Sequence, residues 1–254
     1  MSIKKLGVVV AVALCANATF AEKAKPFTMD AEVGLISTTG NTNTSSAKAK
    51  LDAKQDLKHW RTNYIFEALY KQDEALTGDL EGTEQTTAQR WFSSVQADYK
   101  LDDKHRGLFI FGSYGKDRFS GFDYQSSIAL GFSDRLFQNG RSHLDYSVGP
   151  GVSFNKIEDP GVGQDDKEES AIVRLSANYL YQISENAKFT QTFASDVAVE
   201  SNENTRSSSE TAVSANLSSK LALKASLSLV HNTEVPGTKE NLDTQTAVTV
   251  VYSF

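Results

Sequence analysis

The last twelve residues of the chain alternate between two kinds of side chain. Counting back from the end in steps of two gives a set that is apolar or aromatic apart from one threonine: Phe254, Tyr252, Val250, Val248 and Thr246. Apart from Val251, the residues between them are small or polar. Successive side chains of a β-strand point to opposite faces, so this period of two predicts a strand with one apolar face. The segment is also long enough to cross a membrane as a strand.

A strand in lipid needs hydrogen-bonded neighbours on both edges. The pattern resembles the terminal strand of bacterial outer-membrane barrels, which commonly ends in an aromatic residue with aromatic or aliphatic residues at alternate positions before it. An ordinary strand of a soluble β-protein is the alternative.

Eleven more segments of this kind precede the last one, each bounded by turn-forming residues. Strands buried on both faces would instead be continuously apolar. The sequence therefore predicts an all-β fold, a transmembrane antiparallel up-and-down β-barrel of about twelve strands. The predicted strands are Met29–Ile36, Ser46–Lys54, Trp60–Lys71, Ala88–Leu101, Gly107–Lys116, Tyr124–Arg135, His143–Asn155, Ala171–Gln182, Lys188–Glu200, Thr211–Ser219, Leu221–Asn232 and Asp243–Phe254.

The connections are predicted to alternate between short periplasmic turns and longer outer loops. An even number of strands then places both termini in the periplasm. Thr39-Gly-Asn-Thr42 is expected to form a tight outer hairpin, since Asn and Gly tolerate positive φ. Pro150, between two glycines in mid-strand, predicts a bulge or a kink. The outer loops are predicted at Thr38–Ser45, Gln72–Thr87, Asp117–Asp123, Lys156–Ser170, Ser201–Glu210 and Thr233–Leu242.

Aromatic residues near the strand ends predict two belts at the membrane interfaces. The predicted periplasmic belt is Trp60, Tyr99, Phe132, Tyr146, Tyr179, Tyr181, Phe189, Tyr252 and Phe254, and the outer belt is Tyr70, Trp91, Tyr124 and Phe154.

The N-terminus has the pattern of an export signal: basic Lys4 and Lys5, an apolar core, and small residues at a cleavage site after Ala21. We therefore expect a signal peptide at residues 1–21 and the barrel at residues 22–254. Cys15 follows Leu14 rather than a small residue, which argues against a lipoprotein signal and leaves no cysteine in the mature chain.

Composition fits this interpretation. The chain is 39% hydrophobic with a mean hydropathy of −0.38, which excludes a helical membrane protein but suits a barrel whose strands each have one polar face. Removing the two signal-peptide lysines from 26 basic residues leaves 24 against 32 acidic residues, a charge of −8. This charge argues against nucleic acid as a partner.

Charged residues within strands should point into the lumen, because a charge facing hydrocarbon costs about 2–4 kcal/mol at mid-depth. Either a salt-bridged plug or a small aqueous pore would explain these charges. Barrels of about eight strands are filled by side chains and barrels of about sixteen contain open channels, so twelve strands fit both alternatives. The predicted inward charges are Lys48, Lys50, Asp52, Lys54, Arg61, Glu67, Arg90, Asp98, Asp145, Arg174 and Lys224.

Few residues suggest chemistry. Asp117, Arg118 and Asp123 favour a clamp at the rim over a cation site. His231 is predicted to face lipid near the outer rim, where a hydrolase would need a nucleophile such as Thr244 or Thr246 beside it. The sequence contains neither a Gly-x-Ser-x-Gly nucleophile elbow nor a His-Glu-x-x-His metal-binding motif. We assign no catalytic, cofactor or metal residue and expect no enzyme. The acidic outer loops favour a solvated surface over cation bridging to lipopolysaccharide.

Several motifs resemble the YdiY-like family of salt-induced outer membrane proteins, a family without an assigned activity. The resemblance covers essentially the whole mature chain and rests on residues 32–46, Trp60, Lys116-Asp-Arg-Phe119, Gly121-Phe-Asp, Gly131-Phe-Ser-Asp-Arg-Leu136, Pro236-Gly-Thr-Lys, Asp243 and Tyr252-Ser-Phe254. It implies a barrel in the outer membrane of a Gram-negative cell and no known ligand or reaction.

We therefore expect an envelope protein with a structural or narrow-pore role. Its expected partners are outer-membrane lipid, lipopolysaccharide, and the barrel-assembly machinery that would receive the strand ending at Phe254. The alternatives are an outer-membrane lipid hydrolase using His231 and a soluble periplasmic ligand-binding β-protein.

Overall fold

A computed structural model describes residues 26–38, 44–74, 83–102, 105–118, 120–158, 165–236 and 240–254. The predicted signal peptide and the Thr39–Thr42 hairpin tip lie outside these residues. The described part is a closed antiparallel barrel, which confirms the predicted fold class. Its strands are β1 Phe27–Thr38, β2 Thr44–Asp56, β3 Trp60–Glu74, β4 Glu84–Lys100, β5 Gly107–Asp117, β6 Phe122–Gln138, β7 Ser142–Ile157, β8 Lys167–Ser184, β9 Ala187–Ala198, β10 Arg206–Asn216, β11 Leu221–Asn232 and β12 Leu242–Ser253.

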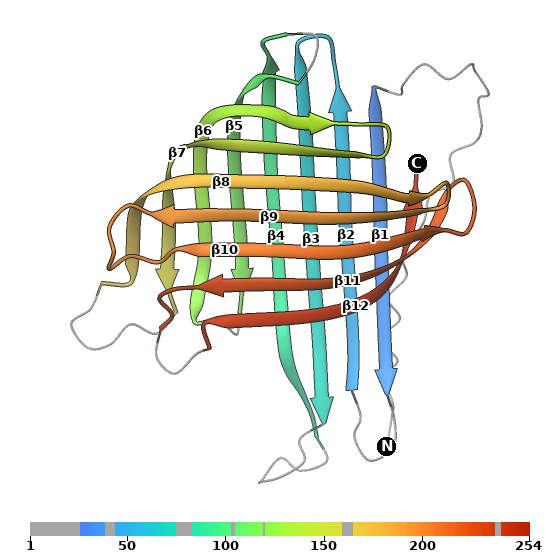
Figure 1. Cartoon of the computed structure of the whole chain (residues 1–254). Helices are drawn as coiled ribbons and strands as arrows, with labels where there is room; N and C mark the ends of the chain where they lie inside the picture. The colour runs from blue at the N-terminus through green and yellow to red at the C-terminus, as the bar shows by residue number, and fades with distance from the viewer. Residues whose placement is uncertain are drawn as a thin grey trace.

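Each strand pairs with the next along the chain, and β12 returns to β1 to close the ring. Tyr252 lies opposite both Leu221 on β11 and Ala31 on β1, so the last strand is the closing strand. The strands at the back run upright in Figure 1 and those in front run across them. Strands tilted by about 35–45° to the barrel axis give this crossing view.

Both described termini lie at one end of the barrel, where the backbone N–H of Phe254 donates a hydrogen bond to the carbonyl of Met29 at 2.9 Å. We call this the termini end. The predicted alternation of connections is largely present, with the shorter ones mostly at this end; the exception is the β4–β5 connection at 101–106, which is longer than the β5–β6 connection at 118–121. The opposite end, called the loop end, carries the connections 39–43, 75–83, 118–121, 158–166, 199–205 and 233–241. No helix in the described ranges is long and apolar enough to cross a membrane.

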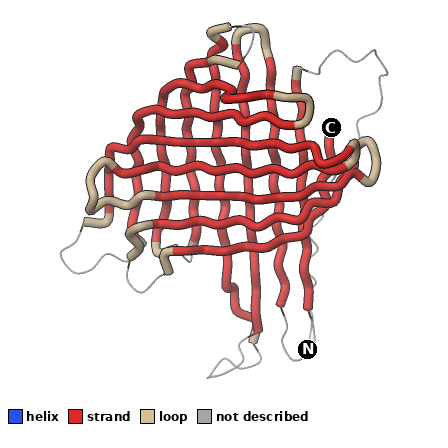
Figure 2. The backbone as a smooth tube through the Cα atoms, in the orientation of Figure 1, coloured by secondary structure: helices blue, strands red, loops and turns tan. Residues whose placement is uncertain are grey.

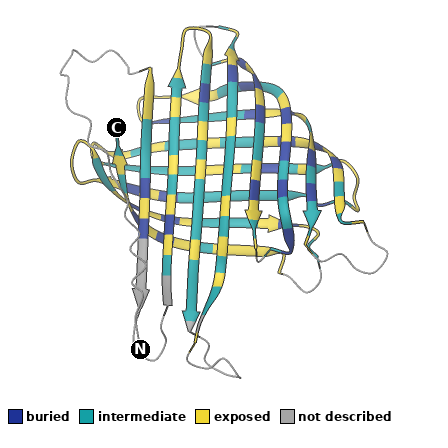
Figure 3. Ribbon diagram, turned by 180° about the vertical axis from the view of Figure 1, so that it is seen from behind, coloured by how far each residue is buried: buried dark blue, intermediate teal, exposed yellow. Residues whose placement is uncertain are grey.

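The two faces of β12 follow its sequence pattern. Val248 and Val250 are 56% and 44% exposed, whereas Thr249 between them is 2% exposed. The same alternation of buried and exposed residues recurs on the strands seen in Figure 3. Apolar side chains on the outside and polar ones inside are the arrangement of a barrel in lipid.

Aromatic contacts are consistent with the two predicted belts. Near the termini end, Trp60 and Tyr99 meet edge to face with ring centroids 5.3 Å apart. Toward the loop end, the ring of Trp91 stacks on that of Tyr114 with centroids 5.2 Å apart, and Tyr114 stacks on Tyr124 at 5.5 Å. Amphipathic rings at both rims fit the headgroup regions of a bilayer.

The segment around Pro150 is a corner of the barrel. The bulge alternative is wrong, because Ala129 opposite Gly151 and Phe132 opposite Val148 share one register. The strands instead bend: β6 and β7 curve from the upright group into the crossing group (Figures 1 and 2). The two backbones come so close here that a Cβ on Gly149 would lie 2.0 Å from the carbonyl oxygen of Leu130. Glycine is required because no side chain fits this gap.

Strand β10 begins five residues earlier than predicted and ends three residues earlier. Arg206-Ser-Ser-Ser-Glu210 has no apolar alternation and therefore resembles a loop, but it pairs with β9 and β11 on both edges. Tertiary pairing overrides the local pattern here. The shift brings Arg206 and Glu210 into the barrel wall.

Leu130, midway along β6, tests which face meets lipid. It is 62% exposed. We expect Leu130→Arg to lower the free energy of unfolding in lipid vesicles by about 2–4 kcal/mol, because the charge faces hydrocarbon. Leu136→Arg, nearer the strand end and 67% exposed, is the control, with an expected cost of about 0–1 kcal/mol. Denaturant titration in vesicles measures both, and equal costs would contradict the assigned depth.

Candidate functional site

The barrel interior contains a cluster of three lysines and three glutamates, which we call the Lys/Glu cluster. Three consecutive strands, β1 to β3, and the two neighbouring strands β10 and β11 supply it, with β12 between the two groups. Its members are Glu32 on β1, Lys48 and Lys50 on β2, Glu67 on β3, Glu210 on β10 and Lys224 on β11.

The ion pairs in this cluster share partners. Lys224 Nζ lies 2.9 Å from Glu32 Oε2 and 2.9 Å from Glu210 Oε1. Lys50 Nζ lies 2.8 Å from Glu67 Oε1 and 3.6 Å from Glu210 Oε1. Glu210 therefore binds lysines from two separate parts of the wall.

Lys48 completes the cluster, with its Nζ 3.9 Å from both Glu32 Oε1 and Glu210 Oε2. Two hydroxyls hold the glutamates in place: Thr249 Oγ1 donates to Glu32 Oε1 at 2.8 Å, and Ser228 Oγ donates to Glu210 Oε2 at 3.3 Å. Every carboxylate of the cluster is thus paired, and the formal charges cancel.

These contacts cross the lumen. Strands β2 and β10 are four positions apart around the ring, so the pairs from Lys48 and Lys50 to Glu210 cannot follow the wall. Glu32 is 4% exposed and Lys48 is 8% exposed. Buried charges are tolerated when they are paired and hydrogen-bonded. The cluster therefore forms a neutral, salt-bridged network that reaches across the lumen.

A second polar group lies on β6, β8 and β9. Arg174 Nη1 donates to Asp196 Oδ1 at 2.6 Å, and Ser127 Oγ donates to Asp196 Oδ2 at 2.9 Å. The Arg174 guanidinium also lies over the ring of Phe111, 3.3 Å from its centroid. Both oxygens of the Asp196 carboxylate are thereby occupied.

Arg206 shows how narrow the lumen is. Its guanidinium carbon lies 5.6 Å from the ring centroid of Phe92, although β10 and β4 are on opposite sides of the ring. Nearby, Asn232 Oδ1 accepts hydrogen bonds from Gln125 Nε2 at 3.2 Å and from Asn204 Nδ2 at 3.0 Å. Side chains from opposing walls therefore meet in this half of the barrel.

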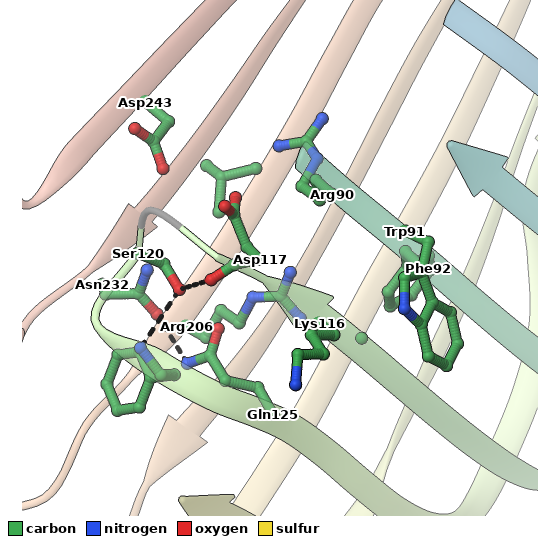
Figure 4. Close-up of a pocket in the computed structure, with 13 residues that line it drawn as sticks. Arg90, Trp91, Phe92, Lys116, Asp117, Ser120, Gln125, Arg206, Asn232 and Asp243 are labelled. Carbon is green, nitrogen blue, oxygen red and sulfur yellow. Dashed lines mark hydrogen bonds between the residues drawn. The ribbon is translucent and has the colours of Figure 1, made fainter. Parts of the chain in front are cut away.

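A cavity opens beside these residues at the loop end. It encloses about 400 Å³ including the space open to solvent. Figure 4 shows Gln125 and Asn232 joined by a hydrogen bond, with Arg206 beside them. Arg90, at the same cavity, donates from Nη2 to Gln245 Oε1 across the barrel at 3.2 Å. A neighbouring space of about 270 Å³, again including space open to solvent, shares Gln125 and Arg206 with it.

The predicted inward charges take part in this network. Asp98, which is 5% exposed, accepts a hydrogen bond from Ser133 Oγ at 2.5 Å and lies 4.0 Å from Arg61 Nη2. Together with the lysines of the cluster, Arg90 and Arg174, these contacts confirm the inward facing. Lys54, near the end of β2, is the most exposed of the set, with 65% of its side chain accessible.

At the rim, Asp123 pairs with Lys116 and lies 3.3 Å from Lys156 Nζ. Asp123 thus belongs to an ion-pair clamp at the rim that joins β5, β6 and β7, and its partners are Lys116 and Lys156 rather than the predicted Arg118. The carboxylate considered for a cation is engaged by two lysines. Within the described ranges, no group of three or more His, Cys, Asp or Glu side chains is placed to hold a metal ion.

The strand register assigns the residues that lie directly opposite His231. Leu242 lies opposite it on β12, whereas Thr244 and Thr246 lie opposite Leu229 and Leu227. Its other cross-strand neighbour is Ser207 on β10.

The Ser207 hydroxyl makes its hydrogen bond with Ser195 at 2.8 Å, not with the imidazole. Thr244, two residues from Leu242 along β12, is a diagonal neighbour of His231, and Thr246 lies farther along the strand.

Sequence reasoning missed three residues that organise the lumen. Glu32 lies on the first strand, whose facing the sequence leaves open, and Glu210 and Arg206 fall in the segment predicted as an outer loop. The available signal was parity: Arg206, Glu210 and Ser214 are in phase on one face of an extended strand.

The geometry defines a class of protein: a twelve-stranded outer-membrane-type β-barrel with an ion-paired polar lumen. The chain belongs to the family described as "Protein of unknown function, DUF481", whose profile matches residues 31–254. The "Uncharacterized protein YdiY" of Escherichia coli (strain K12) is 26% identical over 232 residues, covering 91% of this chain and 84% of that protein. The resemblance to the YdiY-like family is thus confirmed.

Two solved structures share the fold. A NanC porin has a TM-score of 0.51 with 10% identity, covering 88% of this chain and 98% of that one. The translocator domain of the autotransporter NalP from Neisseria meningitidis has a TM-score of 0.50 with 10% identity, covering 91% and 90% of the two chains. At this identity the likeness concerns the fold alone.

Proposed function

We propose that the protein is an outer-membrane barrel whose lumen is closed at rest by the Lys/Glu cluster, so that its role is structural or that of a narrow, normally shut pore. The observation that carries this proposal is Glu210, which binds Lys50 of β2 and Lys224 of β11 and so ties distant parts of the wall together. Removing one partner of such a buried pair costs about 3–5 kcal/mol, because the other charge is left buried and unpaired.

The proposed orientation places the termini end in the periplasm. Support comes from the short connections at that end and the longer ones at the other, as in bacterial barrels generally. The strand ending at Phe254 would then face the barrel-assembly machinery. Outer-membrane lipid would contact the apolar outside, and lipopolysaccharide would surround the loop end. Induction by salt is proposed on the family resemblance, and transcript levels after a salt shift test it.

We also propose that the barrel is not an enzyme. In support, the hydroxyl nearest His231 in register, Ser207, forms its hydrogen bond with Ser195. A general base must lie within hydrogen-bond reach of the nucleophile that it activates. Replacing His231 with alanine should leave hydrolysis of outer-membrane lipids at the background rate.

Liposome swelling tests the closed lumen directly. Vesicles containing the refolded barrel should swell no faster than protein-free vesicles in isotonic solutions of a small sugar. Vesicles with a general porin provide the positive control. Rapid swelling with the wild-type protein would contradict the proposal.

A further inference from the structure

The loop-end cavity is lined by three basic side chains, Arg90, Lys116 and Arg206, and by two acidic ones, Asp117 and Asp243. The neighbouring space, about 270 Å³ including the part open to solvent, is bordered by one carboxylate, Asp196, and one guanidinium, Arg206. Asp196 already accepts hydrogen bonds from Arg174 at 2.6 Å and from Ser127 at 2.9 Å. The Asp196 carboxylate is therefore already paired with Arg174 and makes no ion pair with Arg206.

Arg206 has no ion pair among the described residues. Its described contact is the ring of Phe92, 5.6 Å from the guanidinium carbon. The Nε atom is shut off from solvent and has no hydrogen-bond partner in the described part of the chain. A buried guanidinium without an anionic partner costs free energy that an anion would recover.

A second buried donor points to the same space. Ser153 is 7% exposed, borders the space, and its Oγ has no hydrogen-bond partner among the described residues. Asn155, 5% exposed and two residues further along β7, adds a side-chain amide. A guanidinium, a hydroxyl and an amide around one space match the oxygens of a carboxylate or a phosphate.

We propose that this space, entered from the loop-end cavity, binds a small oxyanion, held by Arg206 with Ser153 and Asn155 as additional donors. The ligand class is a carboxylate- or phosphate-bearing solute small enough to enter past the Gln125–Asn232 hydrogen bond. This inference goes beyond the proposed closed lumen and does not depend on it, because a site at the loop end can fill whether or not the barrel conducts.

Calorimetric titration of the full refolded barrel in micelles tests the site, with inorganic phosphate in one arm and acetate in the other. We expect saturable binding of at least one anion. Arg206→Met should weaken it about ten- to a hundredfold, the loss expected for a hydrogen-bonded charge pair. Arg141→Met is the matched control, because Arg141 is exposed in the β6–β7 turn at the termini end; its binding should stay unchanged.

The two arms identify the chemistry: binding of phosphate alone indicates phosphorylated solutes, and binding of acetate alone indicates carboxylates. Ser153→Ala, a smaller change, should weaken binding less than Arg206→Met while the barrel keeps its heat-modifiable migration on gels. No saturable binding of either anion would overturn the proposal, as would equal affinity of the wild type and Arg206→Met. Equal losses in Arg206→Met and Arg141→Met would also overturn it.

Discussion

Glu210→Gln should turn an electrically silent barrel into a conducting one. The substitution removes the carboxylate that pairs with Lys224 at 2.9 Å and with Lys50 at 3.6 Å, and it leaves Lys48 with Glu32 alone at 3.9 Å. The three lysines then have one positive charge more than the remaining glutamates can balance. They repel one another, and water enters the space between them. We expect discrete conductance steps that favour anions, together with a loss of about 3–5 kcal/mol in the free energy of unfolding.

The matched control is Glu185→Gln, since Glu185 is an exposed glutamate in the β8–β9 turn. That variant should stay silent and as stable as the wild type. If Glu210→Gln is equally silent while folded, the Lys/Glu cluster does not close the lumen. Single-channel recording and denaturant titration on the same preparations give the two readouts.

Gly149→Ala should prevent the barrel from folding. A Cβ at this position would lie 2.0 Å from the Leu130 carbonyl oxygen and 2.6 Å from Gly131 Cα, both backbone atoms that cannot move aside alone. Overpacking in a well-packed interior already costs about 1–3 kcal/mol when side chains can adjust, and here β6 and β7 would have to separate. The expected result is loss of heat-modifiable migration after refolding.

Gly112→Ala provides the comparison, because a Cβ on Gly112 of β5 would meet no atom within 4 Å. That variant should refold with the wild-type yield. Normal folding of Gly149→Ala would mean that the corner between β6 and β7 is wider than described.

The barrel could be predicted from the sequence because each strand carries its own signal. In β12, Val248, Val250 and Tyr252 share one face, and the other face is small or polar apart from Val251. Lipid on one side and a polar lumen on the other require that pattern. Turn residues then bounded the strands, and the resulting count was even. The Gly-Pro-Gly sequence at residues 149–151 indicated an irregularity in β7. The structure shows a bend where two backbones come close together, and not a bulge with an extra residue.

The lumen contacts could not be predicted in the same way. Which lysine meets which glutamate depends on the stagger of strands that are distant around the ring, as for Lys50 and Glu210. The alternation of side chains along each strand indicates that both residues point inward. It does not indicate how far along the barrel axis each one lies. The polar run before Glu210 was also mistaken for a loop, so the residue at the centre of the cluster was absent from the predicted set.

Planar-bilayer recording of the refolded wild-type barrel tests the closed lumen most directly. With Lys48, Lys50 and Lys224 all paired to glutamates, the account predicts stable insertion without conductance steps at moderate salt and voltage. Insertion should be verified on the same vesicles by heat-modifiable migration. Regular, well-resolved conductance steps from the folded wild-type protein would contradict the account.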